Sequence, residues 1–390
     1  MIIELVILKV NPYVKFTLIK FFKATRVLRI VKRSIADLPL HYGKAPKWLF
    51  SRMVKLGKEI SSITISEYGQ KEFLRRISNP FFFQAFGCVL GFDWHSSGLT
   101  TTVIGALKEA RLEEYGVGIA GGKGKASLKA PERIREIVRN FGISKEEKFI
   151  KISRIVAKVD NCLIQDGFSL YHHAMFITER GEWAVVQQGM NEKNKYARRY
   201  HWLGETVKTF VEEPHSGIVS EISVESPLNL IDKGAREARK ASLDIVKENP
   251  KRLRKYFGKN NLLKYFDSKE KLKMDFSHTF DISIYKRIVN LHEFDPKNYE
   301  ELISLRGVGP KTVRALALLA KLIFGSPLVW KDVKIYSFAH GGKDGVPYPV
   351  DRKTYDKTIE ILEDAIKNSE IKRREKVEML KKLGKFFTFS

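Results

Sequence analysis

The residues best suited to chemistry lie in the stretch LRGVGPKTVRAL, residues 305–316, where two glycines and a proline precede a helical pattern. Gly307 and Gly309 can adopt backbone conformations closed to other residues, and they let a ligand approach the main chain closely. Pro310 suits the first position of a helix, because the amide that it lacks would have no intrahelical partner. The free amides at such a helix start, together with the helix dipole, favour an anion such as a phosphate.

Basic side chains surround this turn. Lys311 and Arg314 fall in the first turn of the expected helix, and Arg306 precedes the glycines. The residues expected to contact a phosphate chain are Arg306, Gly307, Val308, Gly309, Lys311, Thr312 and Arg314. Such binding is indifferent to base sequence, because phosphates carry no base identity. The alternative is an ordinary connection between two helices with a glycine cap.

The stretch resembles the helix-hairpin-helix motif of DNA repair and replication proteins. It departs from that motif at Arg306, where a proline is common, and at Val313, where a small alanine usually packs the two helices together. The resemblance covers about 25 residues and implies a helical DNA-binding domain in this part of the chain.

The glycosylase branch of that superfamily implies a further role for Lys311. In that branch a lysine just after the hairpin attacks the sugar carbon, and an aspartate stabilises the developing positive charge. Lys311 matches the lysine, and Asp332 and Asp351 are the two candidates for the carboxylate. A lysine near a positive helix end loses its proton more easily, as nucleophilic attack requires. The alternative is that Lys311 binds phosphate and both aspartates are structural.

A second glycine pair follows in the stretch SFAHGGKDG. Gly-Gly directly after His340 and directly before Lys343 would allow close backbone approach to a ligand. We therefore add His340 and Lys343 to the expected nucleic-acid-binding residues. A plain turn would use the same residue types.

Histidines and one aspartate in the first half of the chain provide a second candidate site. Asp93 and His95 would share a strand face, whereas the neighbours His172 and His173 would point to opposite faces. Together with His201, these side chains form a candidate divalent-metal site or acid–base cluster, as in a metal-dependent nuclease. No H-x-x-x-H, H-E-x-x-H or C-x-x-C spacing supports this site. The alternative is a set of scattered histidines, each with its own structural partners.

The run GVGIAGGKGKAS, residues 116–127, predicts a glycine-rich loop before a helix that opens near Pro131. It does not match the pattern G-x-x-x-x-G-K-[ST], which argues against ATP binding by that route. Residues 116–125 could still hold a phosphate of the nucleic acid.

The elements that position these residues fall into two regions. Helices are expected over residues 46–69 and from about Leu99 to Glu113, and two apolar runs flanking residues 179–182 predict a β-hairpin with a four-residue loop. Helical patterns dominate from about Pro227 onwards. The sequence therefore predicts an α+β fold: a mixed α/β domain over residues 34–218, then an all-α helix-hairpin-helix domain over residues 225–390. Residues 1–33 form a basic N-terminal extension, either an arm or translated upstream sequence.

Composition limits the classes of partner. The net charge of +25 favours a polyanion, with DNA as the expected partner and RNA as an alternative, because backbone charge alone does not separate the two. A basic metabolic enzyme is a further alternative. The chain has only two cysteines, which exclude a disulfide framework and fit a reducing, cytoplasmic setting. No run reaches the roughly 18 apolar residues of a membrane span, so no membrane partner is expected. Abundant Lys and Glu with few Cys and Met is typical of thermophiles.

Several longer peptides extend the resemblance to nearly the whole chain. They are IADLPLHYGKAPKWLF, FDWHSSGLTTT, DGFSLYHH, WAVVQQGMN, ARRYHWL, HGGKDG and PYPVDRKTYD. Together they are similar to an uncharacterised prokaryotic family of unknown function that is frequent in thermophiles and begins near Ser34. The leading hypothesis is a DNA-binding protein of repair or genome maintenance, with base excision as its enzymatic form. A metal-dependent nuclease and a non-catalytic nucleic-acid-binding module are the alternatives.

Overall fold

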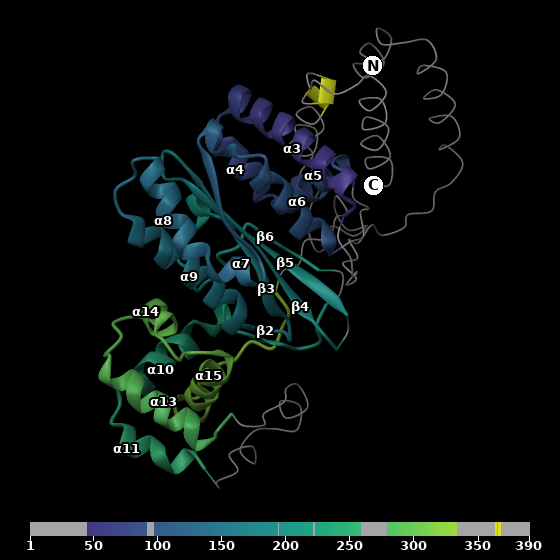
Figure 1. The fold of residues 1–390 in the computed structure, drawn as a ribbon. Helices are drawn as coiled ribbons and strands as arrows, with labels where there is room; N and C mark the ends of the chain where they lie inside the picture. The colour runs from purple at the N-terminus through teal and green to yellow at the C-terminus, as the bar shows by residue number, and fades with distance from the viewer. Residues whose placement is uncertain are drawn as a thin grey trace, which may run out of the picture.

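Figure 1 shows the fold as a computed structural model, which describes residues 45–91, 97–193, 195–220, 223–258, 279–333, 363–364 and 366–367. The N-terminal extension over residues 1–33 lies outside these residues. So do five of the expected site residues, namely Asp93, His95, His340, Lys343 and Asp351.

A five-stranded antiparallel sheet forms the centre, with strand order β1-β3-β4-β5-β6. Its strands are β1 (Val117–Lys123), β3 (Ser169–Thr178), β4 (Trp183–Asn191), β5 (Tyr196–Leu203) and β6 (Gly217–Val219). Strands β3 and β4 pair up to Ile177 and Trp183, so the predicted hairpin with its loop over residues 179–182 is confirmed. A separate two-stranded sheet joins β2 (Ile164–Gln165) to β7 (Leu228–Asn229).

Helices cover both faces of the central sheet (Figure 1). One face packs against α3 (Lys47–Tyr68), α4 (Gln70–Ile77), α5 (Pro80–Val89) and α6 (Gly98–Glu109). The other face packs against α8 (Ala130–Asn140) and α9 (Glu146–Cys162). Successive strand residues alternate between the two cores: Phe176 joins the first and Met175 the second. Because both faces are buried, the middle of β3 reads as a continuous apolar run.

The glycine-rich run over residues 116–127 is mostly strand and not the loop that its composition predicted. Strand β1 pairs along its length with β3 and is buried up to its last residue. A Cβ on Gly118 would lie 2.4 Å from Ile137 Cγ2 of α8, and a Cβ on Gly121 would lie 2.2 Å from the His173 carbonyl oxygen. The glycines therefore serve the close approach of α8 and β3, which propensity alone does not reveal.

The described chain after residue 223 is mainly helical, as the sequence predicted. Its longer helices are α10 (Arg236–Lys247), α13 (Ile282–Glu293) and α15 (Pro310–Phe324), and the shorter ones are α11 (Pro250–Leu253) and α14 (Tyr299–Ser304). Counting the whole described chain, the remaining short elements are α7 (Lys125–Leu128), η1 (Leu112–Tyr115), η2 (Gly204–Thr206), η3 (Lys233–Ala235) and η4 (Arg254–Tyr256).

One continuous core joins these helices to the sheet. Helix α9 lies on the sheet with one side and contacts α14 and α15 with another, so Val156 and Leu316 belong to the same hydrophobic cluster. Ile366, late in the chain, is buried in the cluster of α3–α6 on the other face. The coarse expectation of an α+β fold holds, but the described residues do not form two separate cores divided near residue 220. Across the described residues, no helix is both long and apolar enough to span a bilayer.

Candidate nucleic-acid interface and the adjoining cavity

The glycine turn between α14 and α15 has the local form that the sequence predicted. Helix α14 ends at Ser304 and α15 begins at Pro310, with proline at its first position. Gly307 has φ +88°, a left-handed conformation that favours glycine. Gly309 is extended, with φ −135° and ψ −178°. Only the first glycine is therefore required by backbone conformation.

Open space lies in front of the turn. A Cβ on Gly307 or on Gly309 would meet no heavy atom within 4 Å. Among the described residues, the amides of Gly307, Gly309 and Lys311 have no hydrogen-bond acceptor. They lie at the positive end of a 15-residue helix, so the turn presents unpaired donors and a favourable dipole to an incoming anion.

Fewer side chains around the turn are free to contact a phosphate than the sequence indicated. Arg306 and Lys311 are exposed, and Val308 is buried under the turn. Thr312 is 0% exposed, and Arg314 donates from Nε to Gln165 Oε1 at 2.7 Å. The expectation that Lys311, Thr312 and Arg314 all stay free for phosphate is thus corrected for the last two, because one side of α15 packs against the rest of the molecule.

Two side chains from the first region anchor the turn. Lys158 of α9 donates from Nζ to the Val308 carbonyl oxygen, and it lies 3.4 Å from the carbonyl oxygen of Leu305. Gln165 of β2 donates to the Pro310 carbonyl oxygen at 2.9 Å. These contacts use the carbonyl groups of the turn and leave its amides pointing elsewhere. Burial lowers the pKa of Lys158, and its ammonium is stabilised by those carbonyl dipoles.

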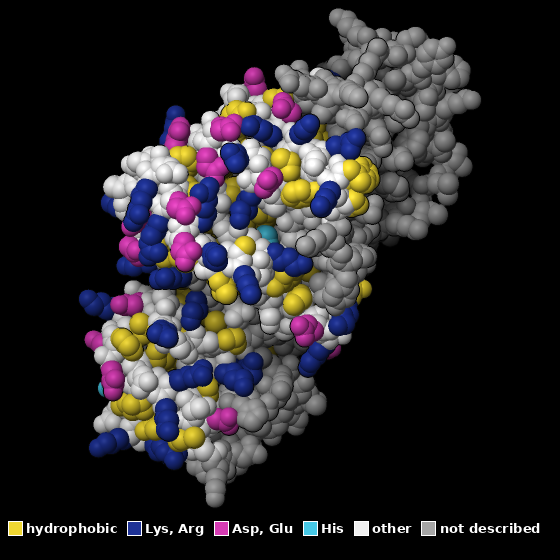
Figure 2. Space-filling model, in the orientation of Figure 1, with side chains coloured by type: hydrophobic (Ala, Val, Ile, Leu, Met, Phe, Trp, Pro, Cys, Tyr) yellow, Lys and Arg dark blue, Asp and Glu magenta, His cyan; other side chains and the backbone are white. Residues whose placement is uncertain are grey.

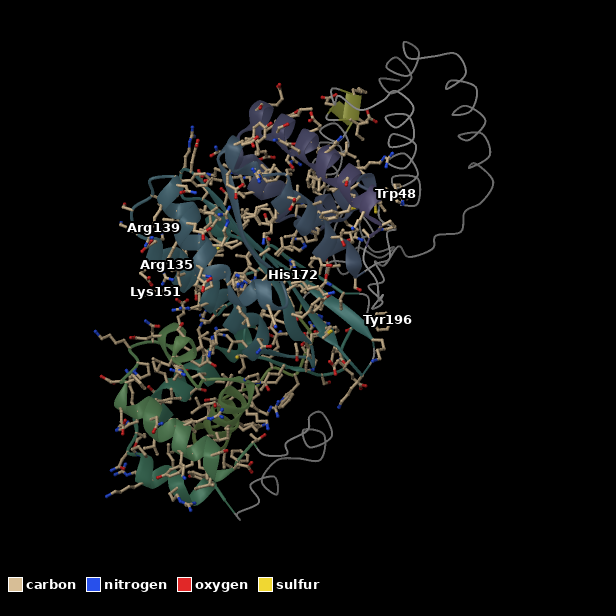
Figure 3. The ribbon with its side chains drawn as sticks, in the orientation of Figure 1. Trp48, Arg135, Arg139, Lys151, His172 and Tyr196 are labelled. Atoms are coloured by element: carbon tan, nitrogen blue, oxygen red, sulfur yellow. The ribbon has the colours of Figure 1, made fainter. Side chains whose placement is uncertain are left out.

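A basic stripe on α9, defined here as Lys151, Arg154 and Lys158, runs up to the turn. Spacings of three and four residues place the three side chains on one face of the helix. Lys151 and Arg154 are exposed and have no acidic partner among the described residues. Figure 2 shows dark-blue Lys and Arg side chains over the edge formed by α8 and α9. Arg135, Arg139 and Lys151 are labelled along that edge in Figure 3, although the two arginines pair with Glu147 and Glu146.

A cavity of about 450 Å³ lies beside the stripe and the hairpin. Its wall combines the start of β3, the segment around α7, one side of α9 and the last residue of α14. Its lining includes Ser127, Ser153, Arg154, Lys158, Tyr171 and His173. Two members of the basic stripe therefore also line the cavity.

A chain of buried hydrogen bonds starts in the wall of this cavity. Ser153 Oγ lies 2.8 Å from His173 Nε2, and His173 Nδ1 lies 2.7 Å from Gln187 Oε1. Gln187 Nε2 in turn donates to Asp160 Oδ2, which also accepts from Trp202 Nε1 at 3.0 Å. Burial lowers the pKa of His173, so the imidazole is held in its neutral form.

The candidate metal ligands that the structure describes do not converge. His173 faces α9, whereas His172 and His201 lie on the other side of the sheet, as adjacent strand residues must. His201 accepts from Arg199 Nε at 2.8 Å and lies 3.2 Å from the Ile77 carbonyl oxygen, so both its ring nitrogens are engaged. No three His, Cys, Asp or Glu side chains in the described ranges are placed to share a metal ion.

His172 stands apart from the other histidines. Both of its ring nitrogens are buried without a hydrogen-bond partner among the described residues. Burial, together with the neighbouring His173 and two lysines, lowers the pKa of His172 to about 3. Its place between α6 and α7 is labelled in Figure 3.

Asp332 belongs to a buried ion cluster. Arg198 of β5 donates two hydrogen bonds to the Asp332 carboxylate, at 2.7 and 2.8 Å, and a third to Asp166 at 2.6 Å. The Val224 amide donates to Asp332 as well, at 2.7 Å. Both carboxylate oxygens are therefore occupied by groups other than Lys311. Asp351, the second candidate partner of Lys311, lies outside the described residues.

Sequence reasoning missed Ser153, Lys158 and Gln165. The basic stripe had a readable signal, because its three cations recur at helical spacing along an amphipathic segment. The Ser153–His173 contact had none, since it joins a helix to a strand through the fold.

Neither the curated proteins nor the solved structures contain a match to this chain. The sequence from residue 34 to residue 350 matches the family described as "Protein of unknown function (DUF763)", and the chain therefore belongs to that family.

Proposed function

We propose that this protein binds nucleic acid, without regard to base sequence, at an interface formed by the hairpin turn and the basic stripe of α9. The observation that carries the proposal is the open turn at Gly307–Pro310, with unpaired amides at the start of a long helix. Exposed Arg306 and Lys311 flank it. The net charge of +25 supports a polyanion as partner.

The proposed biological setting is DNA repair or genome maintenance, in line with the resemblance of the turn to the helix-hairpin-helix motif. The proposal is one of binding. Base excision by Lys311 is a separate hypothesis, because the described carboxylate that was expected to assist it, Asp332, is held by Arg198. Borohydride trapping on abasic duplexes tests that hypothesis: an adduct that is lost in Lys311→Ala would support it, and no adduct would remove it.

Gly309→Ala tests the binding proposal directly. The extended backbone at Gly309 accepts any residue, and a methyl group there meets no protein atom within 4 Å, so folding should be unchanged. The methyl group would nevertheless stand where a phosphate must approach. We expect duplex affinity, measured by fluorescence anisotropy, to fall about tenfold, equivalent to about 1.4 kcal/mol.

Three measurements control this experiment. The melting temperature of Gly309→Ala should match that of the wild type. Wild-type affinity should fall steeply with added salt and should be alike for duplexes of unrelated sequence, as backbone contacts require. Unchanged affinity in Gly309→Ala, or binding insensitive to salt, would refute the proposal. A matched RNA duplex shows whether the protein distinguishes the two backbones.

A further inference from the structure

Ser153 and His173 meet in the cavity wall with the geometry of a nucleophile and its base. The distance of 2.8 Å between Ser153 Oγ and His173 Nε2 is within hydrogen-bond reach. Both residues are buried from bulk solvent, and both line the cavity. Ser153 is not the only hydroxyl there, but Ser127 Oγ donates to the Gly124 carbonyl oxygen instead of to a base.

The hydrogen-bond chain behind His173 fixes which nitrogen carries the proton. The indole nitrogen of Trp202 can only donate, so Asp160 Oδ2 acts as an acceptor. The Gln187 amide therefore turns its donor, Nε2, towards Asp160 and its acceptor, Oε1, towards His173. Because Oε1 can only accept, His173 Nδ1 carries the hydrogen and Nε2 keeps its lone pair. Nε2 therefore accepts from the Ser153 hydroxyl. Gln187 acts as a positioning residue, in the place that an aspartate takes in a Ser-His-Asp triad.

The charges around the cavity indicate the substrate class. Arg154 and Lys158 line the cavity, and Lys151 extends the basic stripe beside it. Cations at this edge favour an ester that carries negative charge near the scissile bond, and a phosphodiester is such an ester. The volume of about 450 Å³ is enough for a small ligand or one nucleotide.

We propose that Ser153 and His173 form a catalytic pair that transfers a phosphoryl group from a phosphodiester bound in this cavity. Ser153 Oγ forms a bond to phosphorus while the bond to the leaving oxygen breaks. The Ser153 proton passes to His173 Nε2 and then to the departing alkoxide. Water, deprotonated by the same nitrogen, hydrolyses the phosphoseryl intermediate and regenerates the hydroxyl. The choice of a phosphodiester rests on the proposed function, whereas the pairing of nucleophile and base does not.

Covalent labelling of the full chain with diisopropyl fluorophosphate tests the pair. Attack by Ser153 displaces fluoride, and we expect one diisopropylphosphoryl group on the peptide that contains Ser153, located by mass spectrometry. Ser153→Ala should lose the label. Ser127→Ala, which removes a different serine hydroxyl from the cavity wall, should keep it. His173→Gln should slow labelling about 100-fold or more, the usual contribution of a general base.

No adduct on the wild-type chain, an adduct elsewhere, or an unchanged rate in folded His173→Gln would overturn the proposal. Because the first two outcomes need only the wild type, the test does not depend on the variants folding. Turnover of bis(p-nitrophenyl) phosphate that is lost in Ser153→Ala would support the phosphodiester, and labelling without turnover would overturn that substrate class.

Labelling at Ser153 and duplex binding are independent measurements. A wild-type chain that binds duplexes but takes no label overturns only the catalytic pair. A chain that is labelled at Ser153 but shows no salt-sensitive duplex binding overturns the interface and leaves the pair in place.

Discussion

Arg198 illustrates how a single residue can organise distant parts of this chain. It is fully buried and bound by two carboxylates, Asp166 from the loop after β2 and Asp332 from the segment after α15. Burial raises the pKa of Asp166 to about 6, even though Arg198 opposes that shift. Pairing with Arg198 therefore offsets the cost of removing these charges from water, and the cluster depends on both carboxylates.

Asp332→Asn tests whether this aspartate is structural. The substitution removes one charge from a buried pair and leaves Arg198 with a single carboxylate. We expect the free energy of unfolding to fall by about 3 kcal/mol, as is typical when one partner of a buried pair is lost. Chemical denaturation measures this change, with the exposed Asp244→Asn as a control near zero. A change below about 0.5 kcal/mol would contradict the structural role.

The buried histidines predict a pH dependence of stability. Burial lowers the pKa of His172 to about 3, and it also lowers the pKa values of His173 and His201 below the unfolded value of 6.5. Below that value the unfolded chain binds more protons, so stability is complete above pH 6.5 and is lost as the pH falls. Each histidine contributes up to about 1.4 kcal/mol per pH unit to the slope of the free energy of unfolding against pH.

Denaturation at a series of pH values measures this slope. Asp166 acts in the opposite direction, because its raised pKa makes the folded state bind the extra proton between its unfolded value of 3.8 and about 6. His172→Gln should flatten the slope without removing a hydrogen bond, since neither ring nitrogen has a partner among the described residues. Stability that increases from pH 7 to about pH 5.5 would contradict this prediction.

At the scale of elements, β1 shows where sequence reasoning failed and why. Its glycines indicate a loop by propensity, but the strand is fixed by pairing with β3, some fifty residues later, and by α8 packed against it. The β3–β4 hairpin was predictable, because its signal lies within one short segment. The hairpin turn at Gly307 was predictable for the same reason.

Gly118→Ala tests the packing of α8 on β1. A Cβ at this position would lie 2.4 Å from Ile137 Cγ2, so the helix or the strand must shift. We expect the free energy of unfolding to fall by about 1–3 kcal/mol, as is usual for overpacking.

Gly105→Ala is the matched control. Gly105 lies inside helix α6, and a Cβ there would make only an ordinary contact with Phe50, at 3.8 Å. Alanine there should leave stability unchanged or raise it by up to about 1 kcal/mol. Equal stability of Gly118→Ala and the wild type would show that α8 is not held close by Gly118.

At the scale of the whole molecule, the net charge favours a polyanionic partner but does not indicate where on the surface it would bind. Lys151, Arg154 and Lys158 are separated from the hairpin by about 150 residues of sequence, and the fold brings Lys158 into contact with the turn. The Ser153–His173 pair likewise depends on α9 lying across the sheet. Such juxtapositions arise from long-range packing and carry no local signal in the sequence.

Nuclear magnetic resonance of the chain labelled with ¹⁵N-glycine tests the interface most directly. On titration with a short duplex, we expect the amide resonances of Gly307 and Gly309 to shift, because their free N–H groups would gain phosphate acceptors. Gly142 and Gly325, which are also glycines with open surroundings, should not shift. If the turn glycines stay unmoved while the duplex binds, the hairpin is not the binding site.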